Sequence, residues 1–193
     1  MTGVRDGRSR RRPAPARGWT RRRALLALIA LAGAVLNLVA SFQVWLRLPD
    51  GAGGVSTASG WGAVAGGAQI AGQNLNDALV GQATFRPGLI PLLFGGLALP
   101  AVLTLALVGE GIHPHRITGA VLAGCGLVTL GWGIWRAVAP DSVGLLATGE
   151  GGPGVGQWLS IAGGVLLVGS ALALLLGVLD PPPVPVPRRI QPG

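Results

Sequence analysis

Apolar residues in this chain gather in four long runs instead of alternating with polar ones. The runs cover residues 24–46, 88–109, 117–135 and 158–179, so each holds 19 to 23 residues, and none contains a charged side chain. The hydrocarbon core of a bilayer is about 30 Å thick and takes about 20 helical residues to cross. Because a backbone in lipid must satisfy its own hydrogen bonds, each run predicts a transmembrane helix. A membrane β-barrel would show alternation over about ten residues instead.

The segments between the runs differ in kind. Residues 110–116 form a short turn, so the second and third helices are expected to be antiparallel neighbours. Residues 47–87 are rich in glycine and too numerous for a simple connection, and within them residues 55–61 favour a short strand. A second connection, 136–157, ends in a glycine-rich stretch.

Composition agrees with a membrane protein. Charged residues make up 11% of the chain, against about 25% in soluble domains, and hydrophobic residues make up 50%, which excludes a disordered chain. The single cysteine, Cys125, excludes a disulfide within the chain. We therefore predict an all-α membrane protein, a four-helix transmembrane bundle in residues 24–179. The heavy use of arginine, alanine, glycine and proline without lysine is typical of a high-GC bacterial genome.

The arginines predict how the bundle is oriented. Nine of the fifteen basic residues precede Ala24, and placing the N-terminus inside puts twelve of them in cytoplasmic segments. Positive charge on the cytoplasmic side is the usual rule, so we expect both termini in the cytoplasm and a multi-pass protein of the cell inner (plasma) membrane. The expected parts are a disordered Arg-rich tail (1–23), outer loops (47–87 and 136–157) and a Pro-rich tail (180–193).

The N-terminal arginines also predict a partner. Basic residues next to a span are attracted to anionic lipids by about 1 kcal/mol each, which favours membrane lipids as the partner. Neutralisation of nucleic-acid phosphates is the weaker alternative. Aromatic residues near the expected outer ends of the helices predict interfacial anchors, because indole rings favour the headgroup level. These anchors are Trp45, Phe85, Trp132, Trp135 and Trp158.

Small residues four apart predict where the helices pack, since helices in lipid associate through close backbone contact and interhelical hydrogen bonds. The first helix offers Gly33, Asn37 and Ser41, and the fourth offers Gly169, Ala173 and Gly177. Asn37 is expected to bond across helices, for example to Thr129 or Ser170, although a polar residue inside a span is also a functional candidate. The stripes either pack the monomer or form a seam with a second copy or a partner.

Candidate chemistry is sparse. Glu110, His113 and His115 do not have the spacing of a structural zinc site. The acidic residues of the outer loops are expected to be solvated and not paired for catalysis. We predict no catalytic, cofactor or metal site. The outer loops instead predict an interaction surface formed by Asp50, Trp61, Asn74, Asp77, Arg86, Arg136 and Asp141.

Several features resemble known small membrane proteins. They are the Arg-rich start, Trp45 at the end of the first run, Ser59-Gly60-Trp61-Gly62 in the first loop, and Gly152-Pro153-Gly154 before Trp158. Together they resemble four-span membrane proteins of high-GC bacteria, including the tryptophan-associated transmembrane family. The topology is similar to that of claudin-like tetraspans, although the paired cysteines of their first loop are missing. The resemblance implies no enzyme activity.

These observations favour a non-catalytic integral membrane protein that acts through interactions, as an accessory or scaffold subunit of a bacterial cell-envelope complex. A protein partner or a homo-oligomer is expected. The alternative is a transporter of small molecules or lipids that acts as an oligomer, with Asn37 and the proline-containing second helix (Pro91, Pro100) lining its path. A membrane enzyme using outer aspartates is a third, less favoured hypothesis.

Overall fold

The computed structural model describes residues 17–49, 53–67, 71–78, 84–107, 112–140 and 151–179. Within this part of the chain lie the long helices α1 (Arg17–Ala40), α3 (Leu89–Leu107), α4 (Ile112–Val138) and α5 (Val155–Leu175). All four are long and apolar enough to cross a membrane. The prediction of four membrane-length helices is therefore confirmed, and the chain has the make-up of a membrane protein.

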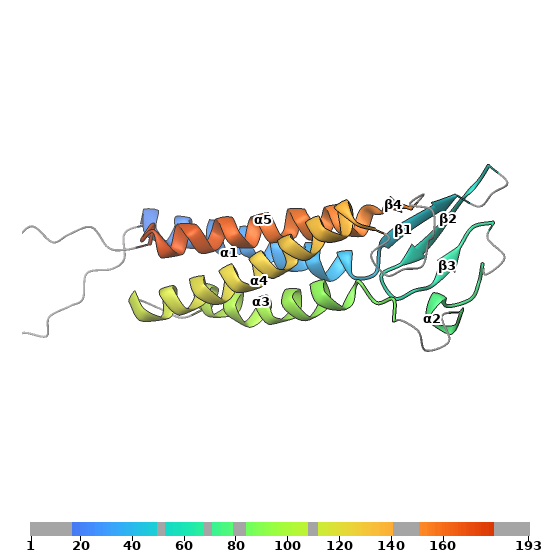
Figure 1. The fold of residues 1–193 in the computed structure, drawn as a ribbon. Helices are drawn as coiled ribbons and strands as arrows, with labels where there is room; N and C mark the ends of the chain where they lie inside the picture. Colours follow the sequence, from blue (N-terminus) through green and yellow to red (C-terminus); the bar gives the residue numbers. More distant parts are fainter. Residues whose placement is uncertain are drawn as a thin grey trace, which may run out of the picture.

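The four long helices form a bundle in which helices that are consecutive in the chain pack side by side (Figure 1). Helix α1 packs against α3 and α5, and α4 packs against the same two helices. The start of α1 and the end of α5 lie at one end of the bundle. The second and third long helices, α3 and α4, are neighbours, as the short connection between them predicts.

The all-α part of the prediction is wrong, because the structure also contains a sheet. Its strands are β1 (Val44–Pro49), β2 (Val55–Ser59), β3 (Val64–Ala65) and β4 (Gly152–Pro153), in the order β3-β2-β1-β4. All three pairings are antiparallel, and Arg47 lies opposite Thr57 on β2 and Gly152 on β4. The strand favoured at 55–61 is confirmed as β2.

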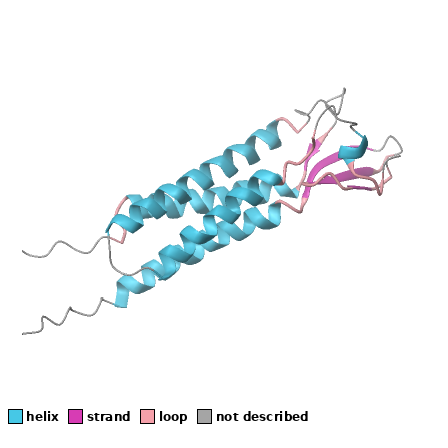
Figure 2. Ribbon diagram, turned by 90° about the horizontal axis from the view of Figure 1, so that it is seen from below, coloured by secondary structure: helices cyan, strands magenta, loops and turns pink. Residues whose placement is uncertain are grey.

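The sheet and the short helix α2 (Leu75–Ala78) lie together at the end of the bundle opposite the start of α1 (Figure 2). We call the four strands, α2 and residues 84–88 the cap. Its core contains the buried side chains of Trp45, Leu46, Ala58, Val64, Leu75 and Phe85. The bundle has a separate core, made largely of alanine, leucine and valine side chains. The cap is thus a small folded unit with a hydrophobic core of its own.

Several predicted boundaries need correction. Helix α1 begins at Arg17 instead of residue 24, and it ends at Ala40, so Trp45 lies on β1. Helix α4 is longer at both ends than predicted and includes Arg136, which the prediction placed in a loop. The apolar run of the first helix continues through residues 42–46, and a buried strand is as apolar as a helix. The prediction of a disordered tail over residues 1–23 is wrong for residues 17–23, which belong to α1, while residues 1–16 and the predicted tail 180–193 lie outside the described residues.

Helices α1 and α4 each approach α5 closely at glycines. A Cβ added at Gly33 on α1 would lie 2.9 Å from the carbonyl oxygen of Gly163 on α5. A Cβ at Gly126 on α4 would lie 3.0 Å from the carbonyl oxygen of Gly164. These distances leave no room for a side chain, so the backbones are in direct contact, as packing in lipid favours.

The predicted small-residue stripe on α5 does not pack the single chain, and its other predicted use, as a seam with a second copy or a partner, stays a prediction. Gly169 is exposed, and a Cβ there would meet nothing within 4 Å. Ala173 is half-buried, and Gly177 lies beyond the end of α5 with a positive φ of 75°. A different side of α5 is buried. In its first half the buried residues are Gly156, Gln157, Ser160, Gly163 and Gly164.

Asn37 makes the kind of interhelical contact that the sequence predicts, but with a different partner. Its Oδ1 lies 3.3 Å from the hydroxyl of Ser160 on α5, and its Nδ2 donates to the carbonyl oxygen of Gly33 at 3.0 Å. The Ser160 hydroxyl is also 3.1 Å from the carbonyl oxygen of Thr129 on α4. Asn37, Ser160 and Thr129 are all fully buried, so this network joins three helices within the bundle.

Candidate functional site

Trp45 lies where the cap meets the bundle. Its side chain is 0% exposed, and its indole nitrogen donates to the carbonyl oxygen of Ala40, the last residue of α1, at 2.7 Å. A Cβ added at Gly60 would lie 2.9 Å from the indole Cδ1, and one at Gly156 would lie 2.6 Å from it. The expectation that Trp45 anchors the protein in the headgroup layer is therefore wrong, because the ring fills the junction instead.

Gln157 connects α5 to β1, a role that no pattern in the sequence predicted. The side chain is fully buried, its Oε1 accepts the backbone N–H of Gly154 at 2.9 Å, and its Nε2 donates to the backbone oxygen of Trp45. Gln157 is the third residue of α5 after the N-cap Gly154. A glutamine at this position commonly reaches back to the N-cap backbone, so its place after a Gly-Val-Gly start could have drawn attention to it.

Two asparagine side chains, Asn74 and Asn76, connect separate backbone segments of the cap by hydrogen bonds. The Asn76 side chain accepts the backbone N–H of Phe85 at 2.6 Å and donates to the carbonyl oxygens of Phe85 and Trp61 at 3.2 and 3.3 Å. Asn74 Oδ1 accepts the backbone N–H of Asn76 at 2.9 Å, and its Nδ2 donates to Trp61. Asn74 was predicted to lie on an interaction surface, but its side-chain amide makes hydrogen bonds to backbone groups of the cap itself. Asn76 was not singled out from the sequence.

Replacing Asn76 with alanine is expected to destabilise the cap by about 1–3 kcal/mol, because the Phe85 backbone groups lose their side-chain partner. Hydrogen exchange at the Phe85 amide should then become faster while exchange in the middle of α5 stays unchanged. Asp77→Ala is the matched control, since Asp77 is the next residue and is exposed. Equal exchange rates at Phe85 in both variants would contradict the role assigned to Asn76.

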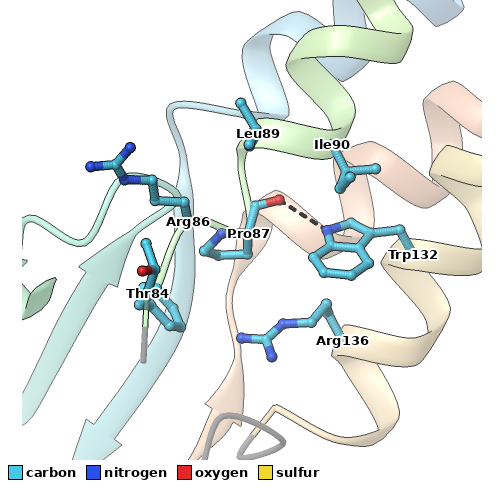
Figure 3. A pocket seen from close by; sticks show the side chains of 8 residues that line it. Thr84, Arg86, Pro87, Leu89, Ile90, Trp132 and Arg136 are labelled. Atoms are coloured by element: carbon cyan, nitrogen blue, oxygen red, sulfur yellow. Dashed lines mark hydrogen bonds between the residues drawn. The ribbon is translucent and has the colours of Figure 1, made fainter. Parts of the chain in front are cut away.

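A cavity of about 370 Å³ opens where the cap, α3 and α4 meet (Figure 3). Trp132 and Arg136 project from α4 toward the segment before α3, and the Trp132 indole nitrogen donates to the carbonyl oxygen of Pro87 at 2.9 Å. The guanidinium carbon of Arg136 lies 5.5 Å from the centre of the Phe85 ring, a cation–π distance. The lining residues are Thr84, Phe85, Arg86, Pro87, Leu89, Ile90, Trp132 and Arg136.

This cavity, which we call the junction pocket, brings together residues that were predicted to have two separate roles. Phe85 and Trp132 were predicted anchors, and Arg86 and Arg136 were predicted members of an interaction surface. Phe85 and Arg136 are 1% and 2% exposed, whereas Arg86 is exposed at the rim with its guanidinium pointing away from that of Arg136. Distance in the sequence hides this grouping, because the residues come from two segments about 50 positions apart.

The other predicted surface and anchor residues lie elsewhere. Trp135 is half-exposed, and its ring meets that of Trp132 edge-on at 5.0 Å. Trp158 is also exposed, Trp61 is half-buried with its ring 6.1 Å from that of Phe42, and Asp77 is exposed. Asp50 and Asp141 lie outside the described residues.

The junction pocket offers groups that bind. It presents the exposed guanidinium of Arg86, the half-buried ring of Trp132 and the hydroxyl of Thr84 next to apolar side chains from the start of α3, whereas Phe85 and Arg136 are buried. A guanidinium stays protonated and donates hydrogen bonds in a planar arrangement that fits carboxylates and phosphates. Among the described residues, no three His, Cys, Asp or Glu side chains are placed to hold a metal ion.

The chain matches no protein-family model, and no curated protein sequence matches it. The resemblance to four-span proteins of high-GC bacteria therefore stays a prediction.

Proposed function

We propose that this protein is a non-catalytic integral membrane protein that acts as an accessory or scaffold subunit, and that its partner binds around the junction pocket. The observation that carries the proposal is the pocket itself, in which the half-buried Trp132 ring and the exposed Arg86 lie at the edge of the bundle over the buried Phe85 and Arg136. Residues that dominate binding at protein interfaces are most often tryptophan, tyrosine and arginine in well-packed pockets. The pocket has this composition.

The way the cap is fixed supports a binding role. Trp45 and Gln157 connect β1 to the end of α1 and the start of α5 through buried hydrogen bonds, and Asn76 connects α2 to the residues before α3. A surface held in one conformation before binding loses less conformational entropy when a partner binds. The cap therefore suits a preformed docking surface.

The proposed orientation places the cap outside the cytoplasm. At the opposite end of the bundle, Arg21, Arg22 and Arg116 are exposed, and six further arginines precede Arg21 in the chain. Positive charge near the ends of spans favours the cytoplasmic side. In this orientation the junction pocket lies at the outer surface of the inner membrane, within reach of other cell-envelope proteins.

The transporter alternative receives less support from the geometry. Its path was expected to include Asn37, but the Asn37 amide is buried and bonded to Gly33 and Ser160 within the helix contacts. A side chain engaged in this way holds helices together. Substrate transport along it would first have to break the network between α1, α4 and α5.

Photo-crosslinking from the pocket rim tests the proposed function. A photoreactive residue at Thr84, which is exposed and lines the pocket, is expected to capture one protein in fixed proportion to this chain. The same residue at Leu103, exposed on the surface of α3, should capture lipid. Arg86→Glu should reduce protein capture from Thr84 at least tenfold, which corresponds to about 1.4 kcal/mol.

Arg47→Glu is the matched control, since Arg47 is an exposed arginine of the cap that does not line the pocket. Capture should persist in that variant. Lipid adducts alone from Thr84, or an equal loss of capture in Arg47→Glu and Arg86→Glu, would count against a partner at the junction pocket.

A further inference from the structure

A second cavity lies between α1 and α3, on the part of the bundle away from the cap. It is a mostly apolar groove of about 600 Å³, and we call it the α1/α3 groove. Ala27 and Val102 are buried in it, at 8% and 4% exposure, whereas Leu28 and Leu103 are exposed beside them. Its lining residues are Arg23, Ala24, Ala27, Leu28, Leu31, Leu99, Val102, Leu103 and Ala106.

The groove ends at a cluster of positive charge. Arg23 lines it and is half-buried, with its Nε donating to the carbonyl oxygen of Leu105 on α3 at 2.6 Å. This bond holds the guanidinium against α3 at one end of the groove. Arg21 and Arg22, the two preceding residues, are exposed. The apolar α1/α3 groove therefore ends near three consecutive arginines.

The length of the groove fits one leaflet of a bilayer. On α1 it extends from Arg23 to Leu31, and eight residues of helix span roughly 12 Å. Half of a hydrocarbon core is roughly 15 Å thick. In a bilayer, the arginines would therefore lie near the headgroup level of the leaflet at the end of the bundle where α1 starts. The leucine side chains that line the groove would lie at the depth of the acyl chains.

We propose that the α1/α3 groove binds an anionic phospholipid, with one acyl chain along the groove and the headgroup phosphate at Arg23 and its neighbours. A guanidinium fits phosphate oxygens with paired hydrogen bonds, and each basic residue near the surface adds about 1 kcal/mol of attraction to anionic lipid. An apolar helix of a second copy or a partner would bring no negative charge to the three arginines. This site is independent of the proposed function of the cap.

Native mass spectrometry of the full-length protein in mild detergent tests the site. With matched acyl chains, one phosphatidylglycerol should bind about tenfold more tightly than one phosphatidylcholine. Arg23→Gln should lower the phosphatidylglycerol affinity about fivefold, while Arg116→Gln should leave it unchanged. Arg116 is the control because it is exposed at the same end of the bundle and does not line the groove.

A second variant fills the groove itself and does not remove a hydrogen bond. Ala106 is exposed and lines the groove, so Ala106→Trp should abolish retention of both lipids without unfolding the bundle. Three results would overturn the proposal: equal affinity for the two lipids, an equal loss in Arg116→Gln, or a bound second copy that Ala106→Trp displaces. The first means that headgroup charge does not contribute to binding, the second means diffuse attraction to the basic end of the bundle, and the third means that the groove is a contact between protomers.

Discussion

Replacing Gly163 with leucine is expected to separate α5 from α1 and to destabilise the folded protein by about 3 kcal/mol. A Cβ at Gly163 would lie 2.8 Å from the carbonyl oxygen of Gly33 and 2.6 Å from Nδ2 of Asn37. The new side chain therefore meets backbone, which cannot rotate away as a flexible side chain can. It also displaces the Asn37 amide from its bond to Gly33. The free energy of unfolding can be measured by steric trapping in bicelles.

Gly169→Leu is the matched control on the same helix. It introduces the same side chain six residues further along α5, at an exposed position with nothing within 4 Å of a new Cβ. The free energy of unfolding of this variant should differ by no more than about 0.5 kcal/mol from that of the unmodified protein, as is usual for surface substitutions. A larger loss in Gly169→Leu than in Gly163→Leu would mean that the opposite face of α5 packs.

Replacing Trp45 with alanine is expected to destabilise the cap by about 3–5 kcal/mol, the usual cost of truncating a buried aromatic residue. The variant loses the hydrogen bond to Ala40 and leaves a cavity between Gly60 and Gly156. Because the bundle has its own core, it should stay folded while the cap opens. Limited proteolysis should then cut within the cap and leave the long helices intact.

Trp158→Ala provides the comparison for that experiment. Trp158 is 58% exposed, and α5 continues through it, so its loss should leave the cap resistant to protease. If both tryptophan variants are cut at the same rate, the junction role of Trp45 is wrong. If Trp45→Ala instead unfolds the bundle along with the cap, the two cores are not separate units.

The long helices could be predicted because a run of about 20 apolar residues has few alternatives in lipid. Their ends could not be predicted as well. The run from Ala24 to Leu46 stays uncharged across the end of α1 and the start of β1, so the absence of charge does not place the change at Ala40. The strand β1 is established by pairing with β2 and β4, which are contacts between residues distant in the sequence.

Which side of α5 packs against the other helices could also not be predicted from the sequence. Helix α5 has small residues on more than one side, and its exposed residues, such as Val165 and Leu172, are as apolar as its buried ones. The sequence therefore offers both the Gly169 stripe and the Gly163 stripe, with no amphipathic pattern to separate them. Asn37 was more informative, because a polar side chain in a span must find a partner.

The junction pocket could be predicted only in part. Its aromatic and arginine residues were recognised by type and by their position near helix ends. Their grouping depends on the extension of α4 to Val138, which brings Arg136 beside Phe85. It also depends on Asn76, which holds the Phe85 backbone in place. Polar side chains that bond to a distant backbone leave no pattern in a single sequence.

Cysteine labelling in intact cells tests most directly whether the cap lies outside and the termini inside. The only native cysteine, Cys125, is buried and can be replaced by serine. New cysteines at Asp77 in the cap and at Arg116 at the opposite end would both be exposed. A membrane-impermeant maleimide should label position 77 in intact cells and position 116 only after permeabilisation. Labelling of position 116 but not position 77 in intact cells would reverse the orientation and contradict the proposed outer docking surface.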